Sequence, residues 1–109
     1  MTITIGNLLF EGPYLYTSDL RDRAGVYVIL DLDIWSNGSY RVINVIDVGE
    51  SENGVKTRIE YHNRKLCWLS NRQGTLAVAV CYIPHHLEST RMAVERATRI
   101  LGLPACGVR

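Results

Sequence analysis

The chain has 109 residues, with 12 Lys and Arg against 11 Asp and Glu and a formal net charge of +1. This length fits one compact domain over residues 1–109 and excludes two ordinary domains. No apolar run is long enough for a membrane span, and the first residues lack the basic start and apolar core of a signal peptide, so we expect a cytoplasmic protein without a membrane partner.

The N-terminal third contains a short strand and the start of a hairpin. Residues 3–10 suggest a strand or extended arm that Gly12-Pro13 breaks. Residues 25–34 and 40–49 are β-rich and alternate apolar side chains, and Asn37-Gly38 between them favours a tight primed turn. The segment 25–49 therefore predicts a β-hairpin.

Two helices and a buried strand are expected after the hairpin, with a short additional helix or a packed turn at residues 67–69 between the first helix and the strand. Apolar residues recur at near-helical spacing over residues 54–66, which would place Arg58 and His62 on one face of one helix. Residues 75–83 are apolar on both faces, as in a central strand covered from both sides. A final helix should run from residue 88 or 89 to 101, and its buried stripe should consist of Ala93, Ala97, Ile100 and Leu101.

These elements predict an α/β (α+β) sandwich, a central antiparallel sheet of three or more strands flanked by helices. The end of the hairpin, the first helix and the last helix could meet at one shallow site, with Tyr27, Arg58, His62 and Glu95 as its candidates. Cys67, Cys81 and Cys106 are odd in number and irregularly spaced, so we expect them to be reduced.

The candidate residues suit phosphodiester hydrolysis. Glu95 could hold Mg²⁺ or Mn²⁺, which need only one or two protein carboxylates. Arg58 could pair with phosphate oxygens, and Tyr27 or His62 could move the proton. Charge is also unevenly distributed, because residues 1–55 hold three basic against eight acidic side chains and residues 56–109 hold nine against three. The basic half could face phosphates.

Each candidate also has a structural explanation. Arg91, Glu95 and Arg99 are four positions apart and could form a solvated ladder of ion pairs on the last helix. Tyr27 could be an ordinary cross-strand aromatic residue. Arg58 and His62 could form the polar edge of an amphipathic helix.

In chain order these pieces resemble the GIY-YIG nuclease family, over about residues 10–104. Gly25-Val26-Tyr27 stands where the family has Gly-Ile-Tyr, and Asp47-Val48-Gly49 stands where it has Tyr-Ile-Gly. Ser51 falls where the family often has a serine. Arg58 with His62 is similar to the arginine-then-histidine helix, and Glu95 to the glutamate of the last helix.

The resemblance implies a GIY-YIG-like fold and metal-dependent cleavage of DNA, double-stranded or branched. Tyr27 would be the general base or its partner, Arg58 would stabilise the transition-state phosphate, His62 would assist, and Glu95 would bind the metal. Asp47 departs from the family tyrosine: it could add a metal ligand, or repel phosphate and mark an inactive copy. A catalytically inactive module that binds nucleic acid or a protein partner is therefore the alternative, and a small nuclease of this kind could work as a homodimer.

Overall fold

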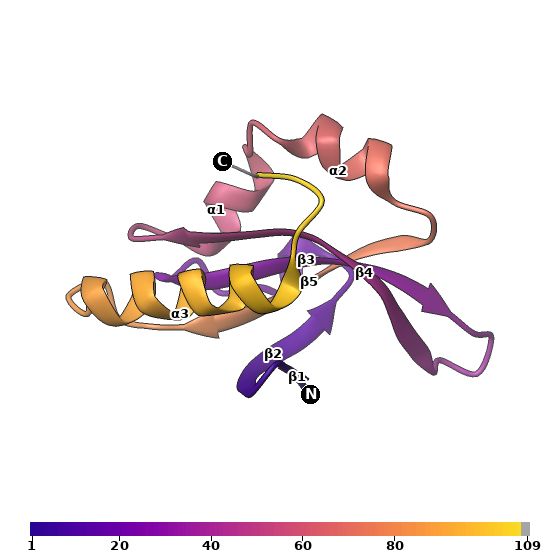
Figure 1. Ribbon diagram of the computed structural model, residues 1–109, viewed down its shortest axis with the longest axis horizontal. Coiled ribbons are helices and arrows are strands. Elements are labelled where there is room, and N and C mark those ends of the chain that lie inside the picture. Colours follow the sequence, from indigo (N-terminus) through magenta and orange to yellow (C-terminus); the bar gives the residue numbers. More distant parts are fainter. Residues whose placement is uncertain (108–109) are drawn as a thin grey trace.

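A computed structural model describes residues 1–107 (Figure 1). Five strands form one antiparallel sheet in the order β1-β2-β5-β3-β4: β1 (Thr2–Ile5), β2 (Leu8–Tyr14), β3 (Gly25–Ile34), β4 (Tyr40–Ser51) and β5 (Thr75–Tyr82). The helices are α1 (Val55–Glu60), α2 (Lys65–Asn71) and α3 (Glu88–Gly102), and a 3₁₀ turn covers Thr17–Asp19. The expected α+β class, with a central antiparallel sheet flanked by helices, is confirmed.

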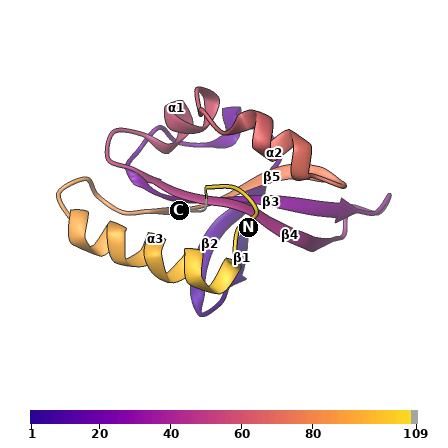
Figure 2. The same cartoon turned by 45° about the horizontal axis from the view of Figure 1, so that its top comes forward.

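Helices cover both faces of the sheet. Figure 2 shows α1 and α2 on one face and α3 on the other. Side chains of β3 alternate between two buried clusters. Tyr27 and Ile29 pack in the first cluster with Val55 of α1 and Trp68 of α2. The alternate residues, Val26, Val28, Leu30 and Leu32, pack in the second cluster, on the side of α3. This double coverage explains why β3 and β5 are buried along most of their length, as expected for central strands.

The β3–β4 hairpin reverses at the expected place but by a different turn. Within this loop, which the structure describes in full, only Gly38 has a positive φ, 89°. The Gly38 N–H donates to the Trp35 carbonyl at 2.9 Å, and the Trp35 N–H donates to the Ser39 carbonyl at 2.8 Å. The connection is thus a turn that ends in a glycine with left-handed backbone angles. A primed turn at Asn37-Gly38 would need a positive φ at Asn37 as well, so that prediction is wrong.

The N-terminal arm is a hairpin that continues past Gly12-Pro13. β1 pairs with β2, and β2 pairs with β5 through a register shift between Glu11 and Tyr14. A bulge tolerates a proline because it leaves one residue outside the ladder of hydrogen bonds. The predicted break at this dipeptide is therefore wrong.

The helix expected over residues 54–66 ends earlier, at Glu60, and the short second helix expected as one possibility at residues 67–69 is α2, which begins at Lys65. α1 ends at Glu60, and the Arg64 N–H donates to His62 Nδ1 at 3.0 Å in the link that follows. A side chain that accepts a backbone N–H competes with the helical pattern. His62 thus lies after the helix that carries Arg58, which corrects the prediction that both share one helix face, and Leu66 is 80% exposed.

The buried stripe of α3 also differs from the prediction, since Ala93, Ala97, Ile100 and Leu101 are exposed. The side chains that α3 buries fully are Arg91 and Thr98, seven positions apart. Arg91 is only 1% exposed because its guanidinium donates to Glu50 Oε1 at 3.3 Å and to the His85 carbonyl at 3.2 Å. Two polar side chains therefore face the sheet beside the partly buried Val94, and a prediction based on hydrophobicity alone misses them.

The expectation that all three cysteines are reduced is wrong. Cys67 of α2 and Cys106, beyond the end of α3, form a disulfide, and Cys81 is free. The two bonded residues are 39 positions apart, so their proximity depends on the tertiary fold rather than on spacing in the sequence. Among the described residues no helix is long and apolar enough to cross a membrane.

Candidate functional site

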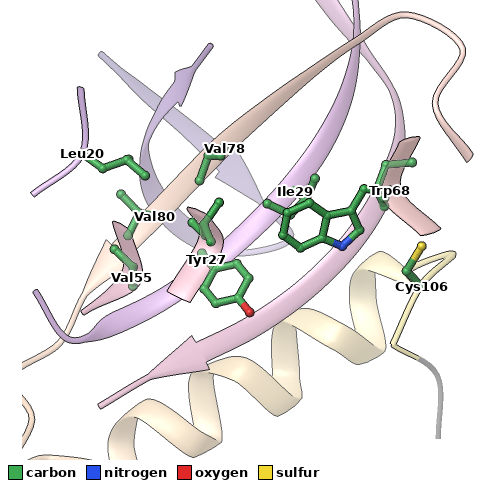
Figure 3. Packing of buried hydrophobic residues seen from close by; sticks show 10 residues of the cluster. Leu20, Tyr27, Ile29, Val55, Trp68, Val78, Val80 and Cys106 are labelled. Atoms are coloured by element: carbon green, nitrogen blue, oxygen red, sulfur yellow. The ribbon is translucent and has the colours of Figure 1, made fainter. Parts of the chain in front are cut away.

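The Tyr27 ring crosses from β3 to the edge strand β4. Tyr27 pairs with Gly49 across the two strands, and a Cβ built on Gly49 would lie 2.2 Å from the Tyr27 hydroxyl oxygen. Figure 3 shows the hydroxyl lying over the β4 ribbon. The missing side chain at residue 49 is therefore what allows the phenol, which is 1% exposed, to pack over β4.

Burial raises the pKa of Tyr27 to about 12, with Asp47 and Glu95 adding to the effect and Arg58 and Arg64 opposing it. The phenol is thus protonated at neutral pH. A group that is to accept a proton from water needs help from nearby positive charge. These opposing influences also show which charged side chains surround the phenol.

His62 lies between Tyr27 and Trp68. Its ring is 5.9 Å from the Tyr27 ring, edge-on, and 4.6 Å from the Trp68 ring. Burial, together with the positive charges of Arg58 and Arg64, lowers the pKa of His62 to about 4, so the imidazole is neutral at pH 7. Because Nδ1 accepts the Arg64 N–H, the ring proton belongs on Nε2, which is buried without a hydrogen-bond partner.

Asp47 is fully buried and its carboxylate is saturated with donors. Arg64 Nε donates to Oδ2 at 2.8 Å, Trp68 Nε1 donates to Oδ2 at 2.7 Å, and the Val48 N–H donates to Oδ1 at 2.8 Å. Arg99 Nη2 lies 3.6 Å from Oδ1 and also donates to the Val48 carbonyl. We call Asp47, Arg64, Trp68 and Arg99 the Asp47 cluster. Within it, the Asp47 carboxylate holds the two arginines in place, and neither of its oxygens faces solvent.

Within residues 1–107, Arg58 is the arginine near Tyr27 whose guanidinium forms no ion pair with a carboxylate. It is half-buried on α1, and its guanidinium is 3.5 Å from Asn63 Oδ1. Among residues 1–107, five other arginines form ion pairs and Arg58 does not: they are Arg21, Arg41, Arg64, Arg91 and Arg99. An arginine without a carboxylate partner can bind an anion by a two-pronged contact.

Glu95 projects from α3 with 23% of its side chain exposed, and its carboxylate is 3.8 Å from Arg99 Nη2. Burial raises the pKa of Glu95, Arg99 lowers it, and Glu50 raises it. The expected ladder on α3 is thus half right: Arg99 pairs with Glu95, whereas Arg91 is buried against Glu50. Two neighbouring carboxylates repel each other, and a cation between them would relieve that repulsion.

His62 packs against Tyr27, and the charges of Arg58, Asp47 and Glu95 all influence the pKa of the Tyr27 phenol, although α3 lies on the opposite face of the sheet from α1. Arg99 of α3 contacts Asp47 and the Val48 carbonyl of β4 and also pairs with Glu95. Within residues 1–107, no group of three or more His, Cys, Asp and Glu is arranged to hold a metal. The donor set fits Mg²⁺ or Mn²⁺ bound by Glu95, because such ions keep several waters and take further oxygens from phosphate.

Three functional neighbours escape the sequence analysis. Arg64, Trp68 and Arg99 contact Asp47 from the α1–α2 link, α2 and α3, respectively. No local pattern links them, because residues 17, 21 and 52 positions apart in the chain meet only in the folded protein. The sequence offered one hint of these partners, which is Asp47 itself. An aspartate in a β-rich run is expected to be buried, and a buried carboxylate requires cationic or N–H partners.

Comparisons of the chain with protein-family models, with curated proteins and with solved structures find no match.

Proposed function

We propose that this domain is a metal-dependent endonuclease that hydrolyses DNA phosphodiester bonds. The observation that supports it most is the electrostatic influence that two side chains from distant parts of the chain exert on the phenol of a third, Tyr27. Arg58 lowers the pKa of Tyr27 and Glu95 raises it, so the guanidinium and the carboxylate both lie within electrostatic reach of the buried phenol. A phenol, an unpaired guanidinium and a carboxylate are the groups that phosphodiester hydrolysis requires.

Each side chain has a distinct role in the proposed reaction. Arg58 binds the non-bridging oxygens of the phosphate and balances the charge that grows in the transition state. Tyr27 directs its hydroxyl along the edge of β4 and exchanges a proton with the attacking water, aided by the positive charge of Arg58 and Arg64. Glu95 holds Mg²⁺ or Mn²⁺, which supplies Lewis-acid polarisation of the phosphate when bound.

His62 and Asp47 act by positioning in this proposal. The neutral His62 packs against Tyr27 and orients the phenol. Asp47 holds Arg64 and Arg99, and Arg99 in turn pairs with Glu95. The carboxylate at 47 thus has an internal electrostatic role in place of the phenol that the GIY-YIG resemblance leads one to expect.

The test is cleavage of supercoiled plasmid and of a four-way DNA junction by the purified protein in Mg²⁺ or Mn²⁺. Arg58→Ala and Glu95→Ala should each abolish cutting. Arg72→Ala and Glu88→Ala are matched controls, because both side chains are exposed and lie outside the site. Cleavage that survives both site substitutions would disprove the proposal.

The second candidate is a catalytically inactive module that binds nucleic acid or a protein partner. The observation that favours it is the pair formed by the anionic Asp47 and a phenol whose pKa is raised to about 12. It predicts DNA binding that weakens with salt and no cleavage under any metal condition. A protein interface on the acidic half of the chain, residues 1–55, could use the partly exposed Asp33 but not Asp31, because Asp31 is fully buried and accepts the Gln73 and Gly74 N–H groups.

A further inference from the structure

The disulfide joins α2 to the residues that follow α3, which we call the C-terminal segment (residues 103–107). Cys106 is 2% exposed, whereas Cys67 is partly exposed. Asn71 Nδ2 lies 3.4 Å from Cys67 Sγ and 3.6 Å from Cys106 Sγ. Cys67 is therefore the sulfur that an external thiolate would attack, and the Asn71 amide is a hydrogen-bond donor close to both sulfurs.

The C-terminal segment covers the outer edge of β4. The Ala105 N–H donates to the Val45 carbonyl at 3.3 Å, and the Cys106 N–H donates to the Ile46 carbonyl at 2.7 Å. A Cβ on Gly107 would lie 2.7 Å from Asp47 Oδ1 and 2.9 Å from Arg64 Cζ. The backbone at Gly107 thus packs directly on the Asp47 cluster and keeps water from it.

One chain of contacts leads from this segment to the candidate site. Arg99 Nη1 donates to the Gly107 carbonyl at 2.7 Å, while Nη2 of the same guanidinium is 3.6 Å from Asp47 and 3.8 Å from Glu95. If the C-terminal segment leaves, Arg99 loses one of its anchors and Asp47 becomes hydrated. Arg99 would then hold Glu95 less firmly, since exposed ion pairs are weak.

We propose that Cys67–Cys106 is a redox modification site at which a dithiol reductant releases the C-terminal segment from the Asp47 cluster and lowers cleavage. A thiolate of the reductant attacks Cys67 Sγ, a mixed disulfide forms, and the Cys67–Cys106 bond breaks with its electron pair on Cys106 Sγ, beside the Asn71 amide. The second thiol of the reductant then displaces Cys67 as a thiolate. The two protons of the reductant pass to the two protein thiolates, and the reductant leaves as its disulfide.

The loss of activity rests on the proposed endonuclease function, whereas the release of the segment does not. Reduction removes the covalent tie, and the contacts that then remain within residues 1–107 include the backbone hydrogen bonds of Ala105 and Cys106, the Arg99 contact and the burial of Pro104 and Cys106. Without the covalent bond, the segment opens once these non-covalent contacts break, which costs less than global unfolding. In a reducing compartment the released form would dominate, and in an oxidising one the clamped form.

The experiment follows amide and indole hydrogen exchange by NMR in the full chain, oxidised and then reduced with dithiothreitol. Exchange at Ala105 N–H, Cys106 N–H and Trp68 Nε1–H should rise at least about tenfold on reduction, while β3 amides stay protected. The Cys67→Ser/Cys106→Ser double variant should exchange like the reduced protein. Cys81→Ser is the matched control, because that thiol is free, and should behave as wild type. Equal exchange in both redox states would overturn the proposal.

Plasmid cleavage in Mg²⁺ is measured on the same samples. The rate should fall at least about tenfold on reduction and recover on reoxidation, as expected when a positioning contact is lost. An equal rate in both states would overturn the control of activity. Faster exchange without cleavage in either state would show that the segment is released as proposed and that the endonuclease assignment has failed.

Discussion

The Tyr27 hydroxyl lies across Gly49, where even one methyl group would come within 2.2 Å of the oxygen. Gly49→Ala should therefore displace the phenol and destabilise the protein by roughly 1–3 kcal/mol, because a buried ring must move. Urea denaturation measures the loss. In the Tyr27→Ala background the same substitution should cost much less, and a cost that is equal in both backgrounds would show that the ring does not sense residue 49.

The carboxylate of Asp47 should contribute strongly to stability. Asp47→Asn removes the charge that Arg64 and Arg99 face and places amide protons against their donors, so the free energy of unfolding should fall by roughly 3–5 kcal/mol. Asp33→Asn is the matched control, because its ion pair with Arg41 is exposed on both sides and should be worth at most about 1 kcal/mol. Similar losses for the two variants, measured by denaturant unfolding, would contradict this assignment.

His62 should make the protein less stable in mild acid. Its pKa is about 4 in the folded protein, below the ordinary 6.5, so the unfolded chain binds more protons between these values. Stability is then complete above pH 6.5 and falls as the pH drops toward 4, by up to about 3 kcal/mol from this residue. His62→Asn retains an acceptor for the Arg64 N–H and cannot titrate, so its unfolding free energy should depend less on pH over this range; an unchanged dependence would count against a buried neutral imidazole.

The cleavage rate should depend on the ionisation of Tyr27. With a pKa of about 12, the phenolate fraction rises about tenfold for each pH unit between 7 and 9, and the rate should rise with it if the phenolate is the base. Tyr27→Phe should lower the rate by roughly 10²–10⁴ and remove this rise. Single-turnover kinetics across this range measure both effects. A flat profile for the wild type would mean that another group accepts the proton.

Much of the sheet could be predicted from the sequence, because strand signals are local. The alternation in residues 25–34 and 40–49 and the uniformly apolar residues 75–83 specify β3, β4 and β5, and Asn37-Gly38 marks the reversal. The bulges could not be predicted, since they depend on how neighbouring strands pair. For the same reason β2 continues through Gly12-Pro13, where the local pattern indicates a break.

The helices were harder to predict, because tertiary contacts decide which face is buried. Arg91 lies inside because its guanidinium donates to Glu50, 41 positions away on β4, and to the His85 carbonyl, six positions away in the loop before α3. α1 stops at Glu60 because His62 accepts a backbone N–H from the link. A hydrophobic pattern carries no information about such polar partners.

For the candidate site, the sequence identified the side chains around the phenol but not the groups that hold them. Tyr27, Arg58, His62 and Glu95 come in an order that resembles a known family; in the folded chain His62 packs against Tyr27, and the charges of Arg58 and Glu95 influence the pKa of the phenol. Arg64, Arg99 and the Cys67–Cys106 bond are tertiary pairings across long stretches of chain, which no spacing rule predicts.

The most direct test of the endonuclease account is the single-turnover rate at which the oxidised protein cuts an end-labelled DNA duplex in saturating Mg²⁺, with and without EDTA. We expect cutting that EDTA abolishes and that Glu95→Gln lowers at least about 100-fold, while Glu88→Gln, at the exposed start of α3, cuts like the wild type. Wild-type cutting that is equally fast in EDTA or in Glu95→Gln would contradict the account.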